Sequence, residues 1–108
     1  METQKELRAF LDAEGRLTAW PAKRKKQLAA LFFLAEKFEA GRTYTEKEVN
    51  ALLDGWHAFR DPASLRRALI DWGFLERERD GSAYWLAQPQ PTPEELGLGE
   101  QEASKRAI

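Results

Sequence analysis

Two adjacent residues, Asp80 and Gly81, most constrain what this chain can fold into. They separate two β-prone runs, 74–79 and 82–86. An Asp-Gly pair between such runs is the strongest short-range signal for a β-hairpin, because a type I′ turn needs a positive φ at both central positions. The sequence therefore predicts a hairpin over residues 75–86, closed by a type I′ turn.

A short helix is predicted upstream of this hairpin, from Thr45 to about Trp56 or His57. Thr45 and Glu48 form a Thr-x-x-Glu capping box, in which each side chain binds the other residue's orphan backbone amide. Apolar residues then recur at i, i+3, i+4 and i+7 from Val49, which places them on one face of the helix. We therefore expect this helix to cover one side of a core.

A second short helix is predicted only a few residues later, over about 62–72. Asp61 is suited to the N-cap, and Pro62 is suited to the first helical position, where a missing N–H costs nothing. Apolar residues recur at i, i+4 and i+7 from Leu65, and Gly73 ends the pattern. The helix therefore has one buried stripe and one polar face.

Two further helices are predicted closer to the N-terminus. The first, roughly 3–13, opens on another Thr-x-x-Glu box at Thr3, and the second runs from Pro21 to about Phe38. The second helix is apolar on more than one side, so we expect it to be the central one, covered by its neighbours. The β-prone residues around Tyr44 predict an additional short strand.

The order of these elements predicts a mainly α domain with a small β-hairpin, of the winged helix-turn-helix type. We expect one domain over 1–86, with a recognition helix at about 62–72 and the wing at 75–86. The prolines that follow predict that 87–108 is a flexible Pro-rich linker and acidic tail. A generic four-helix domain with an appended hairpin stays open, because the connection between the paired helices lacks glycine.

Ordered motifs run from Phe10 to Trp85. They are the basic segment 21–26, the segment 42–50, Leu65-Arg66-Arg67, and Asp80-Gly81 with Tyr84-Trp85. In these motifs the chain resembles an uncharacterised prokaryotic domain family, a domain of unknown function found alone or at the C-terminal end of some bacterial transcriptional regulators. The resemblance implies a link with transcriptional regulation, and it carries no catalytic residue over to this chain.

The overall charge weighs against a nucleic-acid partner without excluding one. The chain has 17 Lys and Arg against 18 Asp and Glu, a formal net charge of −1. Nucleic-acid binders usually carry a basic excess, because neutralising phosphates supplies much of their affinity. Local basic patches must therefore carry any such argument, and we expect a homodimer or a partner regulator to be needed for useful affinity.

The residue types also argue against several function classes. The chain has no cysteine and one histidine, His57, so a metal site would need carboxylates alone around that ring. It has no Gly-rich phosphate loop and no nucleophile with a base partner, so we expect neither an enzyme nor a bound cofactor. No run approaches the ~18 apolar residues of a membrane span, so we expect no membrane partner and a cytoplasmic location.

The candidate contacts to double-stranded DNA lie in a basic turn, on the polar face of helix 62–72, and on the wing. These residues are Lys23, Arg24, Lys25, Lys26, Ser64, Arg66, Arg67, Arg77 and Arg79. Arginine can bond guanine at two points in the major groove, and strand alternation puts both wing arginines on one face. Cations at a helix N-terminus oppose the macrodipole, which an anionic partner would relieve.

Plain solvent exposure explains the same positions equally well. An alternative function from another class therefore stays open: a protein–protein interaction or dimerisation module that uses the winged-helix fold without DNA contact. Trp20 or Trp85 would then contribute to the contact surface, because neither lies on an apolar helix stripe.

Overall fold

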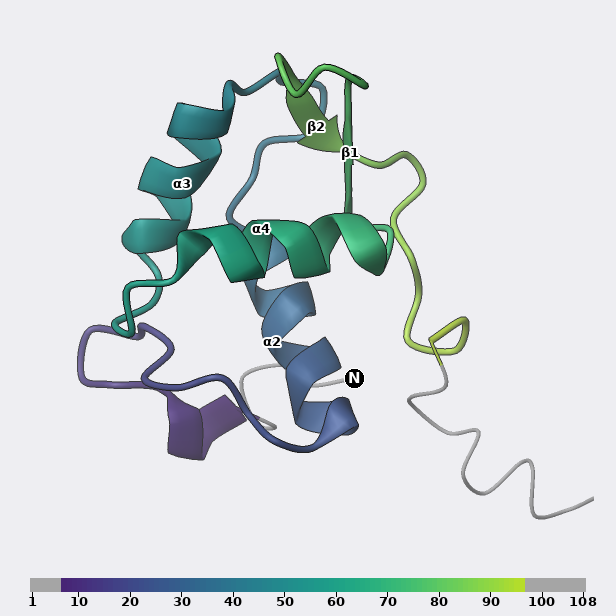
Figure 1. Cartoon of the computed structure of the whole chain (residues 1–108). Helices are drawn as coiled ribbons and strands as arrows, with labels where there is room; N and C mark the ends of the chain where they lie inside the picture. The colour runs from purple at the N-terminus through teal and green to yellow at the C-terminus, as the bar shows by residue number, and fades with distance from the viewer. Residues whose placement is uncertain (1–6, 97–108) are drawn as a thin grey trace, which may run out of the picture.

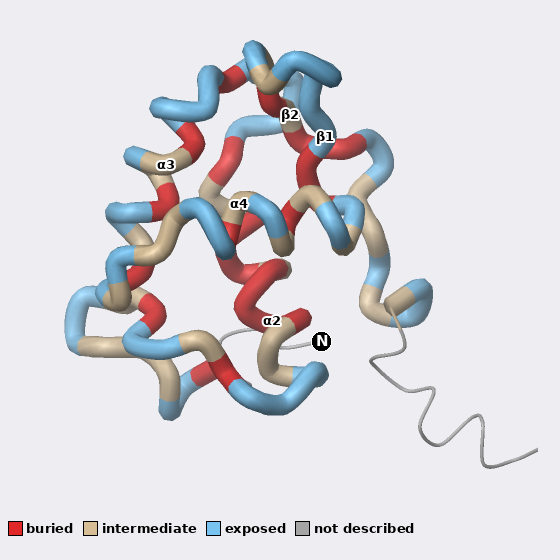
Figure 2. The backbone as a smooth tube through the Cα atoms, viewed as in Figure 1, coloured by how far each residue is buried: buried red, intermediate tan, exposed pale blue. Residues whose placement is uncertain are grey.

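Helix α2 (Arg24–Ala35) lies at the centre of the computed structural model, which describes residues 7–96 (Figure 1). Its buried residues lie on several sides of the helix: Leu28, Ala29, Ala30, Leu31, Phe33, Leu34 and Ala35. Figure 2 shows the first turn of this helix as exposed or intermediate and most of the rest as buried, with its end passing behind α4 (Pro62–Asp71). This confirms the prediction of a central helix covered by its neighbours.

Both ends of α2 lie inside the predicted bounds. Pro21 precedes the helix instead of opening it, and its carbonyl oxygen accepts a 2.8 Å hydrogen bond from the Gln27 side chain. Lys23 is the N-cap, with an extended backbone. At the other end the helix stops at Ala35 and not near Phe38, after which the chain turns.

The predicted helix over 3–13 is wrong beyond Phe10. A single 3-10 turn, η1, spans Arg8–Phe10, and Leu11 is already extended. The Asp12 carboxylate accepts two backbone N–H groups at 2.9 Å each, which stabilises a turn in place of further helix. The capping box predicted at Thr3 lies outside the described residues.

Helices α3 (Glu46–Asp54) and α4 confirm the predicted pair of short helices. Thr45 makes both capping-box hydrogen bonds with Glu48, at 2.9 and 3.1 Å. The Asp61 carboxylate accepts a first-turn N–H of α4 at 3.2 Å, and proline occupies the first helical position. These caps depend on residues within three positions of each other, which is why the sequence predicts them well.

The buried His57 ring fixes the connection between α3 and α4. Helix α3 ends at Asp54, earlier than predicted, and His57 follows in the connection. Its Nδ1 donates to the Leu53 carbonyl oxygen at 2.6 Å, and its Nε2 accepts the Asp61 N–H at 2.8 Å. Leu17 also forms a parallel β-bridge with His57. The connection is therefore held from both of its ends and by the N-terminal segment.

Strands β1 (Leu75–Arg77) and β2 (Tyr84–Leu86) form the predicted antiparallel hairpin, with Leu75 opposite Leu86. Tyr44 pairs with Tyr84 through two 2.7 Å backbone hydrogen bonds. The predicted third strand is thus reduced to a one-residue bridge.

The turn of the hairpin is not the predicted type I′. Gly81 has a positive φ of 79°, but Asp80 does not have a positive φ. The Gly81 N–H donates to the Glu78 carbonyl oxygen at 2.9 Å, and the Asp80 carboxylate accepts the Ser82 N–H at 2.9 Å. The aspartate side chain stabilises a longer turn, so only the glycine needs the left-handed conformation.

Residues 87–96 lie against the helical unit. The Gln90 side chain donates to the carbonyl oxygens of Phe74 and Ala87, both at 2.8 Å, and Leu96 packs against the core. The rest of the segment that we interpreted as a linker and tail, 97–108, lies outside the described residues.

The described residues therefore form a mainly helical unit with three α-helices and a small two-stranded hairpin. The element order, with the Tyr44 bridge between α2 and α3, is compatible with a winged-helix-like topology. None of the helices within residues 7–96 has the length and apolar character needed to span a bilayer.

Candidate nucleic-acid interface

The polar face of α4 points away from the core (Figure 2). Leu65 and Leu69 are buried beneath it. The exposed residues of the helix are Ala63, Ser64, Arg67 and Asp71. The face that the sequence predicted for groove contact is therefore accessible along the whole helix.

Ser64 also has a structural role at the start of this face. Hydrogen bonds from its hydroxyl and its backbone N–H lower the pKa of Asp61, the α4 N-cap. The Asp61 carboxylate therefore stays ionised at neutral pH at the N-terminal end of α4, where it complements the helix dipole.

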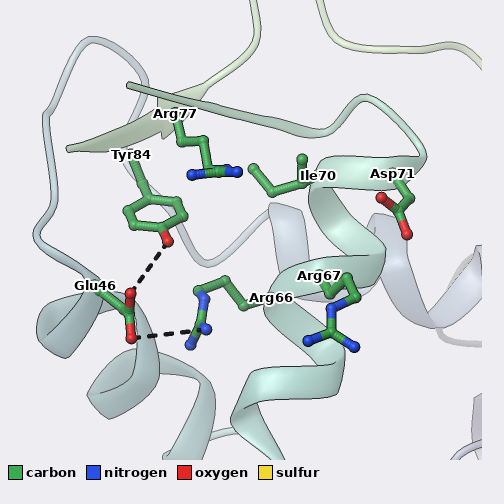
Figure 3. Close-up of a pocket in the computed structure, with 7 residues that line it drawn as sticks. All are labelled: Glu46, Arg66, Arg67, Ile70, Asp71, Arg77 and Tyr84. Carbon is green, nitrogen blue, oxygen red and sulfur yellow. Dashed lines mark hydrogen bonds and ion pairs between the residues drawn. The ribbon is translucent and has the colours of Figure 1, made fainter. Parts of the chain in front are cut away.

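Arg66 is half-buried and is turned toward α3 (Figure 3). Its Nη1 donates to the Asn50 side-chain oxygen, and its Nη2 lies 3.7 Å from Glu46 Oε2. Its side chain is 18% exposed, against 53% for Glu46. Arg66 therefore ties α4 to α3, whereas its neighbour Arg67 is exposed.

A pocket of about 450 Å³ lies between α4, the hairpin and the start of α3 (Figure 3). Its lining residues are Glu46, Arg66, Arg67, Ile70, Asp71, Arg77 and Tyr84. The structure thus brings three of the predicted site residues together around one cavity. Sequence reasoning missed the contributions of Glu46 and Tyr84, because both come from elements that are distant along the chain.

The two wing arginines lie in different surroundings. Arg77 ends β1 and lines the pocket, with Nη1 3.4 Å from the carbonyl oxygens of Glu78 and Arg79. Arg79 is exposed and lies beyond the end of β1, in the turn. The strand alternation that would pair their faces therefore stops at Arg77.

The basic turn flanks α4 on the side opposite the hairpin (Figure 1). Lys23, Arg24 and Lys25 are exposed, and Lys26 is half-buried. The Arg24 guanidinium lies 5.2 Å from the centre of the Trp72 ring and donates to the Leu96 carbonyl oxygen at 3.2 Å. This contact brings the basic turn next to the C-terminal end of α4.

The two tryptophans considered for protein contact are both half-buried. Trp20 packs against the hydrophobic core, and Trp85 donates from its ring nitrogen to Glu76 Oε1 at 2.9 Å. Over residues 7–96, no group of three or more His, Cys, Asp or Glu side chains is arranged to hold a metal ion.

Comparison with known proteins gives a family but no characterised relative. A family model described as "uncharacterized protein conserved in bacteria" (DUF2087) matches residues 16–86. The matched segment includes α2, α3, α4 and both strands, and so contains every element of the candidate interface. No curated protein and no solved structure matches the chain. The chain therefore belongs to the DUF2087 family of uncharacterised proteins conserved in bacteria.

Proposed function

We propose that this chain is a DNA-binding transcriptional regulator, or an accessory domain of one, with a winged helix-turn-helix fold. In this proposal α4 enters the major groove, which is wide enough to admit an α-helix. The hairpin and the basic turn then contact phosphates on either side of the groove, because they flank α4 from opposite sides (Figure 1).

The exposure of Arg67 is the observation that carries this proposal. Arg67 lies on the outward face of α4, one turn after the small exposed residues Ala63 and Ser64. Small side chains let a helix approach base edges closely, and an arginine beside them can bond guanine O6 and N7. Arg66 serves as a positioning residue, because its contacts with Asn50 and Glu46 orient α4 relative to α3.

The acidic residues near this face limit the affinity of a single copy. Asp71 is exposed near the end of the same face, and Glu46 lines the adjoining pocket. Since phosphate contacts supply much of the affinity for DNA, we expect a monomer to bind weakly. A homodimer or a partner regulator would place two α4 helices on successive half-sites and raise the affinity.

The test measures binding to a mixed-sequence DNA duplex by fluorescence anisotropy across a series of salt concentrations. For wild type, log K should fall linearly with log salt, by about 0.9 per neutralised phosphate. Arg67→Ala should weaken binding by roughly fivefold or more, because an arginine contact to DNA contributes about 1–3 kcal/mol. Arg66 is left unchanged, because its loss would also disturb the contact between α3 and α4.

The matched control is Arg8→Ala, which removes an exposed arginine on η1, away from α4 (Figure 1). It should change the affinity less than about twofold, since isolated exposed charges contribute little. Equal losses in the two variants would contradict docking through α4. No binding at low salt, together with a dimer on size-exclusion chromatography, would instead support the protein–protein interaction module.

A further inference from the structure

We propose that the pocket between α4 and the hairpin binds a phosphate group. Two sources share this chemistry: a backbone phosphate of DNA, or the phosphate of a small molecule. The first source rests on the proposed function, whereas the second does not. The pocket combines arginines from two elements with a volume of about 450 Å³.

On one wall of the pocket, a positive and a negative side chain of the lining lie close to each other. Arg66 Nη2 lies 3.7 Å from one oxygen of Glu46, and the Tyr84 hydroxyl donates to the other oxygen at 3.4 Å. The charges of Arg66 and Glu46 therefore offset each other at close range. The remaining charges of the lining are those of Arg67, Arg77 and Asp71, which leave one positive charge in excess.

Arg77 is oriented by the turn of the hairpin. Its Nη1 lies 3.4 Å from two turn carbonyl oxygens, and its side chain reaches from β1 toward α4 in Figure 3. Within residues 7–96 it forms no ion pair with a carboxylate. The carbonyl contacts hold one edge of the guanidinium but do not neutralise its charge. An anion in the pocket would supply that neutralisation.

The positions of the arginines favour phosphate over carboxylate. A planar guanidinium binds two oxygens of either group side by side, so one arginine can satisfy a carboxylate. A phosphate group presents further oxygens, and so it can also accept from a second arginine of the pocket lining. The volume lies within the range of about 300–1,000 Å³ for small-molecule sites, so an attached group also fits.

The test titrates inorganic pyrophosphate into the ¹⁵N-labelled full chain, at constant ionic strength, and follows chemical shifts by NMR. Wild type should show saturable shifts at residues of α4 and the hairpin. Arg77→Gln should weaken binding by about tenfold, the loss of one charge-assisted contact. The matched control, Arg79→Gln, removes the same charge two residues away, outside the pocket lining, and should change binding less than about twofold.

A second pair of variants tests whether removing a negative charge from the pocket strengthens pyrophosphate binding. Asp71→Asn removes the carboxylate that opposes an anion in the pocket, so pyrophosphate should bind about threefold tighter. Asp54→Asn removes an exposed carboxylate at the end of α3, outside this pocket, and should leave binding unchanged. Absence of saturable shifts, equal losses in the two arginine variants, or no gain in Asp71→Asn would overturn the proposal.

Adding duplex DNA to the pyrophosphate-bound chain separates the two sources. Displacement of pyrophosphate by the duplex identifies the site as one for a backbone phosphate. Simultaneous binding of both identifies a small phosphorylated ligand. Pyrophosphate binding without any duplex binding would refute the DNA-binding function and leave the phosphate pocket standing.

Discussion

His57 joins the end of α3 to the start of α4 through one buried side chain. Its Nδ1 donates to the Leu53 carbonyl oxygen, and its Nε2 accepts the Asp61 N–H. Both ring nitrogens are therefore used, one as a donor and one as an acceptor, which requires the neutral imidazole with its proton on Nδ1. The sequence argues against a metal site at this residue, because the chain has no cysteine and no second histidine, but it contains no signal for the role of His57 in the α3–α4 connection.

Replacing His57 with leucine should destabilise the fold by about 1–3 kcal/mol, because the half-buried Asp61 N–H loses its acceptor and the buried Leu53 carbonyl oxygen is left with the Trp56 N–H. The free energy of unfolding from urea denaturation measures this loss. Lys47→Leu, at an exposed position of α3, is the control and should change stability by less than about 0.5 kcal/mol. A His57→Leu variant as stable as the control would show that these hydrogen bonds do not hold the connection.

The N-cap of α4 and two turns depend on ionised aspartates. Hydrogen bonds from Ser64 lower the pKa of Asp61 below its ordinary value of 3.8. The Arg16 backbone N–H is the largest cause that lowers the pKa of Asp12, and Ser82 lowers that of Asp80. A carboxyl whose pKa is lower in the folded state stabilises the fold above its unfolded pKa, and this contribution disappears as the pH falls through the folded pKa.

The free energy of unfolding should therefore be insensitive to these three groups near neutral pH and should fall as the pH drops below about 4. In Asp61→Asn the amide oxygen can still cap α4, but it does not titrate, so the loss of stability below that pH should be shallower. Urea denaturation at a series of pH values measures both profiles. Identical acid profiles in wild type and Asp61→Asn would show that the α4 cap does not contribute to acid sensitivity.

At the scale of the whole molecule, the sequence predicts what short-range chemistry determines. The caps at Thr45 and Asp61, the pattern of α4 and the hairpin all follow from residues close together in the chain. The predictions from sequence are wrong where a contact with a more distant residue, or a competing side-chain hydrogen bond, determines the local structure. Helix α2 starts later than predicted, and the Gln27 side chain donates to the carbonyl oxygen of Pro21, which precedes the helix. In the hairpin, the Asp80 side chain stabilises a turn other than type I′.

In the candidate site, too, some features could be predicted from short-range sequence patterns and others could not. The exposure of Arg67 follows from the helical period of α4, so the sequence predicted it. The pairing of Arg66 with Asn50 depends on how α3 packs against α4, and the separation of Arg77 from Arg79 depends on where β1 ends. Neither has a signal in a single sequence, because both are set by tertiary contacts.

The central claim is that α4 and the elements on either side of it form a DNA-binding surface. The most direct measurement is an NMR titration of the ¹⁵N-labelled chain with a DNA duplex, read as a map of perturbed backbone amides. We expect perturbations over 63–71, 77–83 and 23–26, each weakening as salt is added. Perturbations confined to η1 and the turn that follows it, or none at low salt, would contradict this claim.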